Sequence, residues 1–172
     1  MKAVARADRI ACMRQPPPPV IDSARILAYA FVDDLAYRQW GKLFVGGRPV
    51  EKVPRLAIAV NLGKDIGPLL LHCDEAWNVI ATSGADSVEA VKARAERNYP
   101  GISARWVDTN ISLEEALRYY DEEWPGLMCS FWCKRPFEVE GVVEGPGVAI
   151  CRACVEDCYQ IFHPPDEGAT PA

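Results

Sequence analysis

Five of the seven cysteines in this chain lie between Cys129 and Cys158. Four of them form two pairs, Cys129 with Cys133 and Cys151 with Cys154, and a spacer of 17 residues separates the pairs. A zinc ion prefers four soft ligands at the corners of a tetrahedron, and two nearby cysteine pairs meet that need at little cost in chain entropy. We therefore predict that Cys129, Cys133, Cys151 and Cys154 bind Zn²⁺.

The residues between and after the two pairs predict how this segment folds. The run Gly145-Pro146-Gly147 has turn chemistry, so the spacer is expected to return as a hairpin. Val155, Tyr159 and Phe162 then repeat at helical spacing. Knuckle, hairpin, second knuckle and helix is the order of a treble-clef or zinc-ribbon-like module. A segment of roughly 35 residues cannot build an adequate core alone, so metal binding is expected to supply much of its folding free energy.

The run from Glu144 to Cys158, EGPGVAICRACVEDC, resembles the second half of the zinc-binding domain of the protein-unfolding ATPase ClpX. That family has a Gly-Pro-x-Val-x-Ile-Cys-x-x-Cys-Val element, followed by a helix that carries a further cysteine. Cys129-Ser130-Phe131 and then Lys134 resemble the first knuckle of the same domain. In ClpX this domain dimerises and binds substrates and adaptor proteins. The resemblance therefore implies an interaction module.

The first cysteine pair departs from the family pattern. The family spaces this pair C-x2-C, whereas here Trp132 occupies the expected ligand position and Cys133 follows one residue later. A C-x3-C pair is still within the range of zinc spacings, but its turn must be wider. The alternative is a site of three thiolates, with Cys158 or water completing the shell. Cys158 itself is expected to be a buried helix cysteine outside the ligand set.

The ATPase engine of ClpX has no counterpart in this sequence. No G-x-x-x-x-G-K-[ST] phosphate loop occurs, since Gly63-Lys64-Asp65 lacks both the spacing and the hydroxyl. We therefore expect no ATP binding and no enzyme activity. The predicted function is protein–protein interaction or dimerisation through the C-terminal module, in an adaptor or regulator linked to Clp-type proteolysis.

Other interpretations of the reactive residues are weaker. Cys151 and Cys154 are spaced like a redox pair at a helix start, but the first cysteine pair and the resemblance favour metal. His72 and Cys73 could form a nucleophilic pair, yet adjacent strand residues point to opposite faces and would not meet. The acidic runs Asp33-Asp34 and Asp121-Glu122-Glu123 lie at expected element ends, where carboxylates are normally solvated.

Charge argues against nucleic acid and membrane partners. The net charge is -5 and the sequence pI is about 5.1, without a run of basic residues. Between residues 129 and 163, three basic residues stand against five acidic ones. No apolar stretch approaches the ~20 residues of a membrane span, and the first 20 residues lack the apolar core of a secretory signal. We expect a cytoplasmic protein.

The domain organisation is predicted from composition and from the positions of proline and glycine. Residues 1–20 are predicted to be a flexible lead ending in four prolines, 21–125 an α+β domain, 126–163 the zinc module and 164–172 a flexible tail. The middle part has the order strands, helix, strand, helix, which predicts a small antiparallel sheet with two helices on one face. An alternative gives this domain the main role, as an immunity-type or other partner-binding domain, with zinc as a structural staple only.

Several strands are expected before the first helix. Residues 23–32 predict a strand or a short helix, and residues 43–45 predict a hairpin with the chain from Pro49 onward, around Gly46-Gly47. Residues 56–60 form another apolar run, and residues 69–72 predict a hairpin with residues 77–81. Four tryptophans could belong to the core or to a binding groove: Trp40, Trp77, Trp106 and Trp124.

The two helices are predicted from their capping signals. Asp86 with Glu89 has capping-box spacing, and Pro100-Gly101 is expected to end that helix. Residues 104–107 predict a short strand. Ser112 with Glu115 repeats the capping signal for a second helix. The expected buried face of this second helix is Leu113, Leu117, Tyr120 and Trp124.

Overall fold

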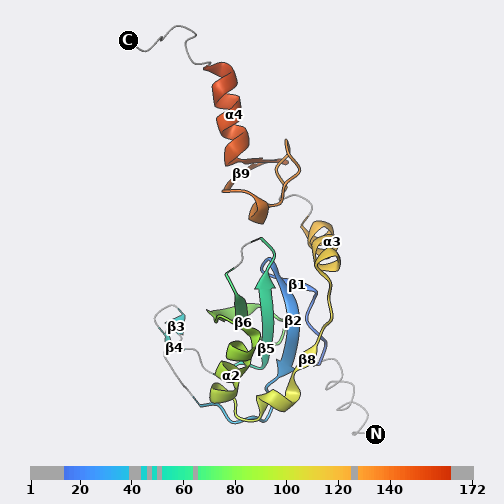
Figure 1. Ribbon diagram of the computed structural model, residues 1–172, viewed down its shortest axis with the longest axis vertical. Helices are drawn as coiled ribbons and strands as arrows, with labels where there is room; N and C mark the ends of the chain where they lie inside the picture. The colour runs from blue at the N-terminus through green and yellow to red at the C-terminus, as the bar shows by residue number, and fades with distance from the viewer. Residues whose placement is uncertain are drawn as a thin grey trace. The chain divides into compact units, whose positions relative to one another are not determined.

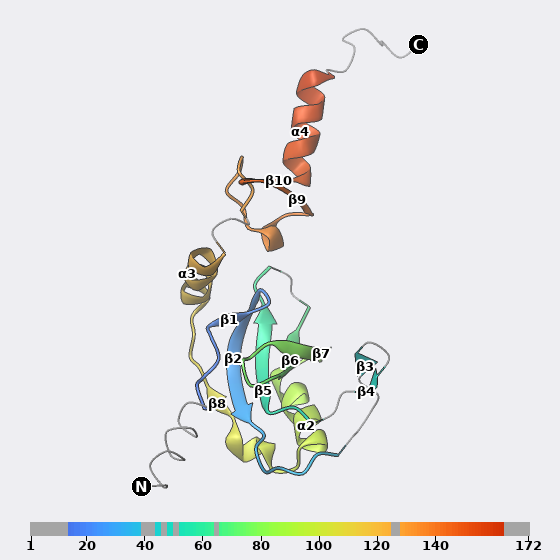
Figure 2. The same ribbon diagram turned by 180° about the vertical axis from the view of Figure 1, so that it is seen from behind.

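The computed structural model describes residues 14–38, 44–45, 48–49, 52–63, 66–124 and 128–163. The chain divides into two compact units, Met1–Tyr120 and Asp121–Ala172. Figures 1 and 2 show the elements of both units from opposite sides. None of the helices in the described ranges is long and apolar enough to cross a membrane.

The first unit is built on one curled antiparallel sheet, with the strand order β1-β2-β5-β6-β7 (Figure 1). A short strand, β8, pairs with β2 on the same edge as β1. The strands of this sheet are β1 (Val20–Ile21), β2 (Ala24–Phe31), β5 (Arg55–Asn61), β6 (Pro68–Cys73), β7 (Val79–Gly84) and β8 (Val107–Asp108). Two further strands, β3 (Phe44–Val45) and β4 (Arg48–Pro49), pair only with each other.

A bulge in β2 determines which side chains face which side of the sheet. The register with β5 shifts between Ile26 and Ala28, so Leu27 is the extra residue. Thr109 supplies hydrogen-bond donors to both carbonyls at the bulge. Its hydroxyl donates to the Ile26 carbonyl at 2.6 Å, and its amide donates to the Leu27 carbonyl at 3.0 Å. After the bulge, Ala28 and Ala30 face the opposite side of the sheet from Ile26.

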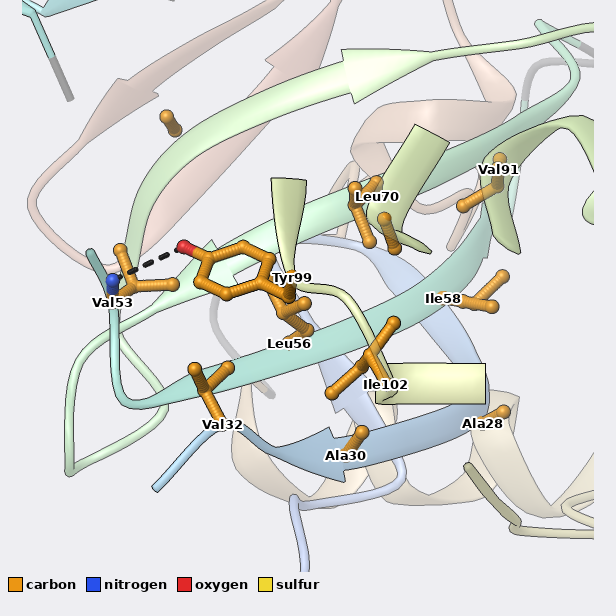
Figure 3. Close-up of a cluster of buried hydrophobic side chains, with 12 residues drawn as sticks. Ala28, Ala30, Val32, Val53, Leu56, Ile58, Leu70, Val91, Tyr99 and Ile102 are labelled. Carbon is orange, nitrogen blue, oxygen red and sulfur yellow. Dashed lines mark hydrogen bonds between the residues drawn. The ribbon is translucent and has the colours of Figure 1, made fainter. Parts of the chain in front are cut away.

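Both faces of the sheet are therefore apolar, and each carries its own buried cluster. The first cluster contains Ala28, Ala30, Val32, Val53, Leu56, Ile58, Leu70, Ala81, Val91, Ala95, Tyr99 and Ile102 (Figure 3). The second contains Ile21, Ala24, Ile26, Ala57, Ala59, Leu71, Cys73 and Trp77. The indole Nε1 of Trp77 donates to the Gln15 carbonyl at 3.1 Å, which holds the segment before β1 near the second cluster.

Tyr99 fills the middle of the first cluster and is fully buried (Figure 3). The Val53 amide donates a hydrogen bond to its hydroxyl oxygen at 3.2 Å, so the polar end of the ring has a partner. Burial raises the pKa of Tyr99 to about 12. This tyrosine is a core residue and not a titrating group at neutral pH.

The first helix, α2 (Val88–Asn98), supplies Val91 and Ala95 to the first cluster. Its cap corrects the sequence prediction, because Ser87 and not Asp86 is the N-cap residue. Ser87 has extended backbone angles, and its hydroxyl accepts from the Ala90 amide at 3.1 Å.

The strand predicted over residues 104–107 was wrong in most of its length. Residues Ile102–Arg105 form a short 3₁₀ helix, η1, and only Val107–Asp108 pair as β8. Gly101, with φ of 91°, turns the chain so that Ile102 inserts into the first cluster, and that burial outweighs the strand propensity of the segment.

The second predicted helix is α3 (Leu113–Glu123). Its N-terminal cap is confirmed, since the Ser112 hydroxyl accepts from the Glu115 amide at 3.1 Å. The predicted buried face is confirmed in part, because Tyr120 is buried and Leu117 and Trp124 are half-buried, whereas Leu113 is 51% exposed. Ala116 is also buried, and this small residue gave no hydrophobic signal in the sequence.

The other sequence predictions for this unit have these outcomes. Residues 24–31 form a strand and not a helix, and the hairpin of β6 with β7 is confirmed. The pairing of Phe44–Val45 with Arg48–Pro49 is also confirmed, although Gly46 and Gly47 lie outside the described residues, as does Trp40.

The second unit contains one hairpin and one helix that lie between and after the cysteine pairs (Figure 2). Strand β9 (Val142–Gly145) pairs antiparallel with β10 (Val148–Cys151), and Pro146-Gly147 forms the turn with Gly147 at φ of 74°. Proline followed by a residue with positive φ is the arrangement of a type II turn. A 3₁₀ turn, η2 (Pro136–Glu138), precedes the hairpin, and α4 (Arg152–Phe162) follows it. The predicted hairpin and helix are confirmed.

Candidate metal centre

Three of the four predicted ligands lie together. The ligand atoms of Cys129, Cys151 and Cys154 are all within 4.8 Å of one another, and all three residues are buried. The Cys154 sulfur is 3.6 Å from that of Cys129 and 3.5 Å from that of Cys151. Zinc–thiolate bonds of about 2.3 Å in a tetrahedron place sulfurs about 3.8 Å apart. The three thiols therefore occupy positions close to three corners of such a tetrahedron, and the donor set fits Zn²⁺.

The first corner is held by a tight turn. The Cys129 amide donates to the Lys134 carbonyl at 2.8 Å, and the Cys133 amide donates to the Cys129 carbonyl at 2.7 Å. The same turn is attached to the hairpin, since the Ser130 amide donates to the Ala149 carbonyl at 2.7 Å and the Ala149 amide to the Ser130 hydroxyl at 3.0 Å. These bonds fix the Cys129 side chain relative to β10.

The second and third corners come from the junction of β10 with α4. Cys151 is the last residue of β10, pairs with Val142, and is also the N-cap residue of α4. Cys154 lies in the first turn of that helix, so three residues of helical backbone bring its thiol beside that of Cys151. A C-x2-C pair at a strand-to-helix junction thus places two sulfurs 3.5 Å apart with no loop between them.

The surroundings of these thiols favour deprotonation at one of them. The backbone amide of Trp132 is the main cause that lowers the pKa of Cys129 to about 6. Burial opposes this shift, and the amides of Cys151 and Phe131 add to it. Burial, with the neighbouring sulfurs, raises the pKa of Cys154 to about 12. The surroundings therefore favour the thiolate at Cys129, whereas Cys154 needs a cation beside it to lose its proton.

Cys133 and Cys158 lie outside this group of three. Cys133 is exposed, and its φ of 53° places it in the left-handed region. Cys158 lies one turn beyond Cys154 on α4 and is half-buried, less covered than expected. Coordination by all four cysteines of the two pairs stays a prediction, with Cys129, Cys151 and Cys154 as the part that the geometry brings together.

Sequence reasoning missed a charged contact that supports the module. Arg135 makes two parallel bonds to Asp121, with Nε to Oδ1 at 2.7 Å and Nη2 to Oδ2 at 2.6 Å. Such paired bonds are among the stronger charge-assisted contacts, and they hold the pKa of the Asp121 carboxyl below its ordinary value. Glu138 also accepts from the Arg135 amide at 2.7 Å. The i, i+3 spacing of Arg135 and Glu138 could have predicted their contact, but nothing in the sequence indicated that Asp121 would join them.

The other candidate residues do not form a second site of this kind. His72 faces the first cluster, because its strand partners are Leu56 and Ala81, whereas Cys73 belongs to the second cluster. The predicted separation of these two side chains by the sheet is confirmed. Burial lowers the pKa of His72 to about 4 and raises the pKa of Cys73 to about 12, so both are neutral near pH 7.

Three of the five acidic residues singled out from the sequence have basic partners. Asp34 binds Arg105 at 3.0 Å, which holds the pKa of the Asp34 carboxyl below its ordinary value, and Asp33 binds Arg14. Asp121 binds Arg135 as described above. These contacts are ion pairs at the surface and account for the carboxylates without a metal.

The buried group of three cysteines, the hairpin and the following helix define a cysteine-type zinc finger. The family model that matches the chain is the ClpX C4-type zinc finger, over residues 127–163. These residues are a ClpX C4-type zinc finger domain, as the resemblance of the sequence implied, and their cysteine group is consistent with Zn²⁺. Neither a curated protein nor a solved structure matches the chain.

Proposed function

We propose that this is a non-catalytic zinc-binding protein whose C-terminal finger binds another protein, with a second copy of the chain as the first candidate. The observation that carries this proposal is the apolar surface of the finger. Within the described residues, eight of the twelve large apolar side chains that are exposed belong to the finger. Exposed apolar patches on small modules commonly mark interaction sites.

The hairpin contributes one part of this surface. Cross-strand partners share a face of a hairpin, so Val143, opposite Ile150, lies on the same side as Val148, opposite Gly145. The other side carries the buried Ala149 and Cys151, next to the cysteine group. The outer side is therefore apolar but open, with Val143 67% exposed and Val148 59% exposed.

The helix contributes the other part. Val155, Tyr159 and Phe162 repeat at i, i+4 and i+7 and so lie along one face of α4. The sequence predicted this stripe, and the structure leaves it uncovered: Tyr159 is 63% exposed and Phe162 is 78% exposed. A helix in a groove, or two such helices together, would remove this stripe from water.

The proposed partner is a protein and not a nucleic acid. Three basic and five acidic residues between positions 129 and 163 give the finger a negative balance before its thiolates are counted. Arg135 and Arg152 are already engaged with Asp121, Glu138 and Glu156. The proposed role in Clp-type proteolysis, as adaptor or regulator, rests on the family resemblance. The treble-clef or zinc-ribbon-like class of the module rests on the order of knuckle, hairpin, second knuckle and helix.

The alternative assigns partner binding to the first unit, as an immunity-type or other binding domain, and leaves zinc as a staple. It is supported by the two separate buried clusters of that unit, which need no metal. Substitutions in the finger that leave zinc in place separate the two proposals.

The test is sedimentation velocity of the full chain with one zinc bound, at micromolar concentration. We expect a dimer that the double variant Val143→Glu with Phe162→Glu converts to a monomer with unchanged metal content. Leu113→Glu, at a similarly exposed position in α3, is the matched control and is expected to stay dimeric. A wild-type chain that remains monomeric with zinc bound removes the dimer proposal. If the zinc-bound chain also fails to bind a purified Clp unfoldase, the proposed adaptor role is contradicted as well.

A further inference from the structure

Three of the four predicted zinc ligands are held in place by the fold of the finger. Cys129, Cys151 and Cys154 are 0%, 0% and 3% exposed, and each is held by the hairpin, the knuckle turn or the first turn of α4. Their mutual distances already suit a tetrahedral ion. Their positions therefore depend on the fold of the finger and not on a loop that closes around the metal.

The fourth predicted ligand, Cys133, is placed quite differently. It is exposed, its sulfur is not in the group of three, and its backbone has φ of 53°, which non-glycine residues seldom adopt. One extra residue separates it from Cys129 relative to the C-x2-C spacing of the family. Its amide donates to the Cys129 carbonyl at 2.7 Å, so the backbone of Cys133 lies close to the site although its sulfur is outside the group of three.

A cavity of about 410 Å³ opens at this corner. Its lining residues are Met128, Cys129, Ser130, Cys133, Glu144, Gly145, Gly147 and Val148. The buried ligand Cys129 and the exposed Cys133 thus share the wall of one cavity. Three of the lining residues, Ser130, Gly145 and Gly147, have small side chains or none, so a small molecule has room in this cavity.

We propose that the fourth zinc position is exchangeable: Cys133 occupies it in one state, and a small external thiol occupies it from the cavity in the other. The exchange is a ligand substitution without redox change. The entering thiol gives its proton to water and binds as thiolate, and the Cys133 thiolate leaves and takes a proton. A thiolate is the ligand that an ion with three thiolates already bound accepts readily.

Glu144 gives this cavity a charge preference. It lies opposite Ala149 in the hairpin, on the side that faces the cysteine group, and it is the carboxylate among the lining residues. A negative charge there disfavours anionic thiols and favours those with an ammonium group. We therefore expect cysteamine to enter more readily than thioglycolate.

The experiment uses the full chain loaded with one Co²⁺, whose thiolate charge-transfer absorption reports the number of bound sulfurs. Cys133→Ala is expected to bind the metal with an intensity reduced to that of three thiolates. Added cysteamine should restore the intensity of four, and thioglycolate should do so less well. Cys151→Ala is expected to lose the metal and not to recover it with either thiol, because its corner is buried. Cys158→Ala is expected to match wild type.

Three results would overturn the proposal. An unchanged spectrum in Cys133→Ala would show that this residue is never a ligand, and loss of metal would show that its corner is as fixed as the others. Failure of both thiols to restore the intensity would exclude an external ligand. Glu144→Gln with an unchanged preference for cysteamine would remove the role given to this carboxylate. None of these measurements involves a protein partner, so their failure leaves the docking proposal standing.

Discussion

The two units of this chain bury their apolar residues to very different extents. The first unit places twelve residues in one buried cluster and eight in another, on opposite faces of one sheet. The buried cluster of the second unit consists of three cysteines with a few half-buried apolar residues packed against it, and eight large apolar side chains of the finger are exposed. The first unit is held together by hydrophobic burial, whereas we expect the second to need a metal because it buries little apolar surface.

Removal of zinc should give the largest difference between the units. We expect chelation, or Cys154→Ser, to abolish the protection of backbone amides in residues 128–163 while the amides of β2, β5 and β6 stay protected. The reason is that metal binding to a structural finger is worth about 10 kcal/mol or more, which exceeds what so small a core supplies. Hydrogen exchange followed by mass spectrometry measures both units in one sample. Cys158→Ser is the control and should retain zinc.

A loss of protection that spreads into β5 would contradict the comparison. It would mean that the first unit depends on the metal as well, despite its two clusters.

Acid should weaken the first unit through His72. This histidine is 3% exposed, its Nδ1 has no hydrogen-bond partner, and burial lowers its pKa from 6.5 to about 4. A base with a lowered folded-state pKa contributes stability that is full above the unfolded pKa of 6.5 and is lost as pH falls towards 4. At 1.36 kcal/mol per pKa unit, the expected loss is about 3 kcal/mol.

Urea unfolding of the chain at pH 7 and pH 4.5, followed by hydrogen exchange of the amides of β2, β5 and β6, measures this loss. The variant His72→Leu should show a markedly smaller difference between the two pH values. An equal difference in the variant would assign the acid sensitivity to other groups.

The smallest expected effect concerns the cap of α2. Ser87→Ala removes the hydroxyl that accepts from the Ala90 amide and should lower the free energy of unfolding by about 1 kcal/mol. Asp86→Ala should cost much less, because Asp86 is not the cap residue. Thermal unfolding of both variants beside wild type measures the difference. A larger loss of unfolding free energy in Asp86→Ala than in Ser87→Ala would show that Asp86 is the cap residue, as the sequence predicted.

The sequence predicted local chemistry well and long-range contacts poorly. The Pro146-Gly147 turn and the Ser112 cap are each properties of a few consecutive residues, and each was found as predicted. The bulge at Leu27 was not predictable, because it depends on where Thr109 meets β2. The ion pair of Arg135 with Asp121 likewise joins residues that no local pattern connects.

The candidate site shows the same limit. Spacing indicated which cysteines could bind a metal, but it could not show that Cys133 is exposed while the other three are buried. That difference arises from the conformation of one turn, where an additional residue takes a positive φ. Likewise, helical spacing predicted the stripe of Val155, Tyr159 and Phe162 but not that it is exposed among the described residues of its unit.

The turn of the hairpin offers a way to stiffen the finger by chirality alone. Gly147 has φ of 74°, a backbone angle that L residues rarely adopt. L-Alanine would be strained there by its backbone angle, whereas D-alanine prefers that angle and would restrict the unfolded chain. A semisynthetic chain with D-alanine at position 147 should therefore hold β9 and β10 together more firmly, with every cysteine left as it is.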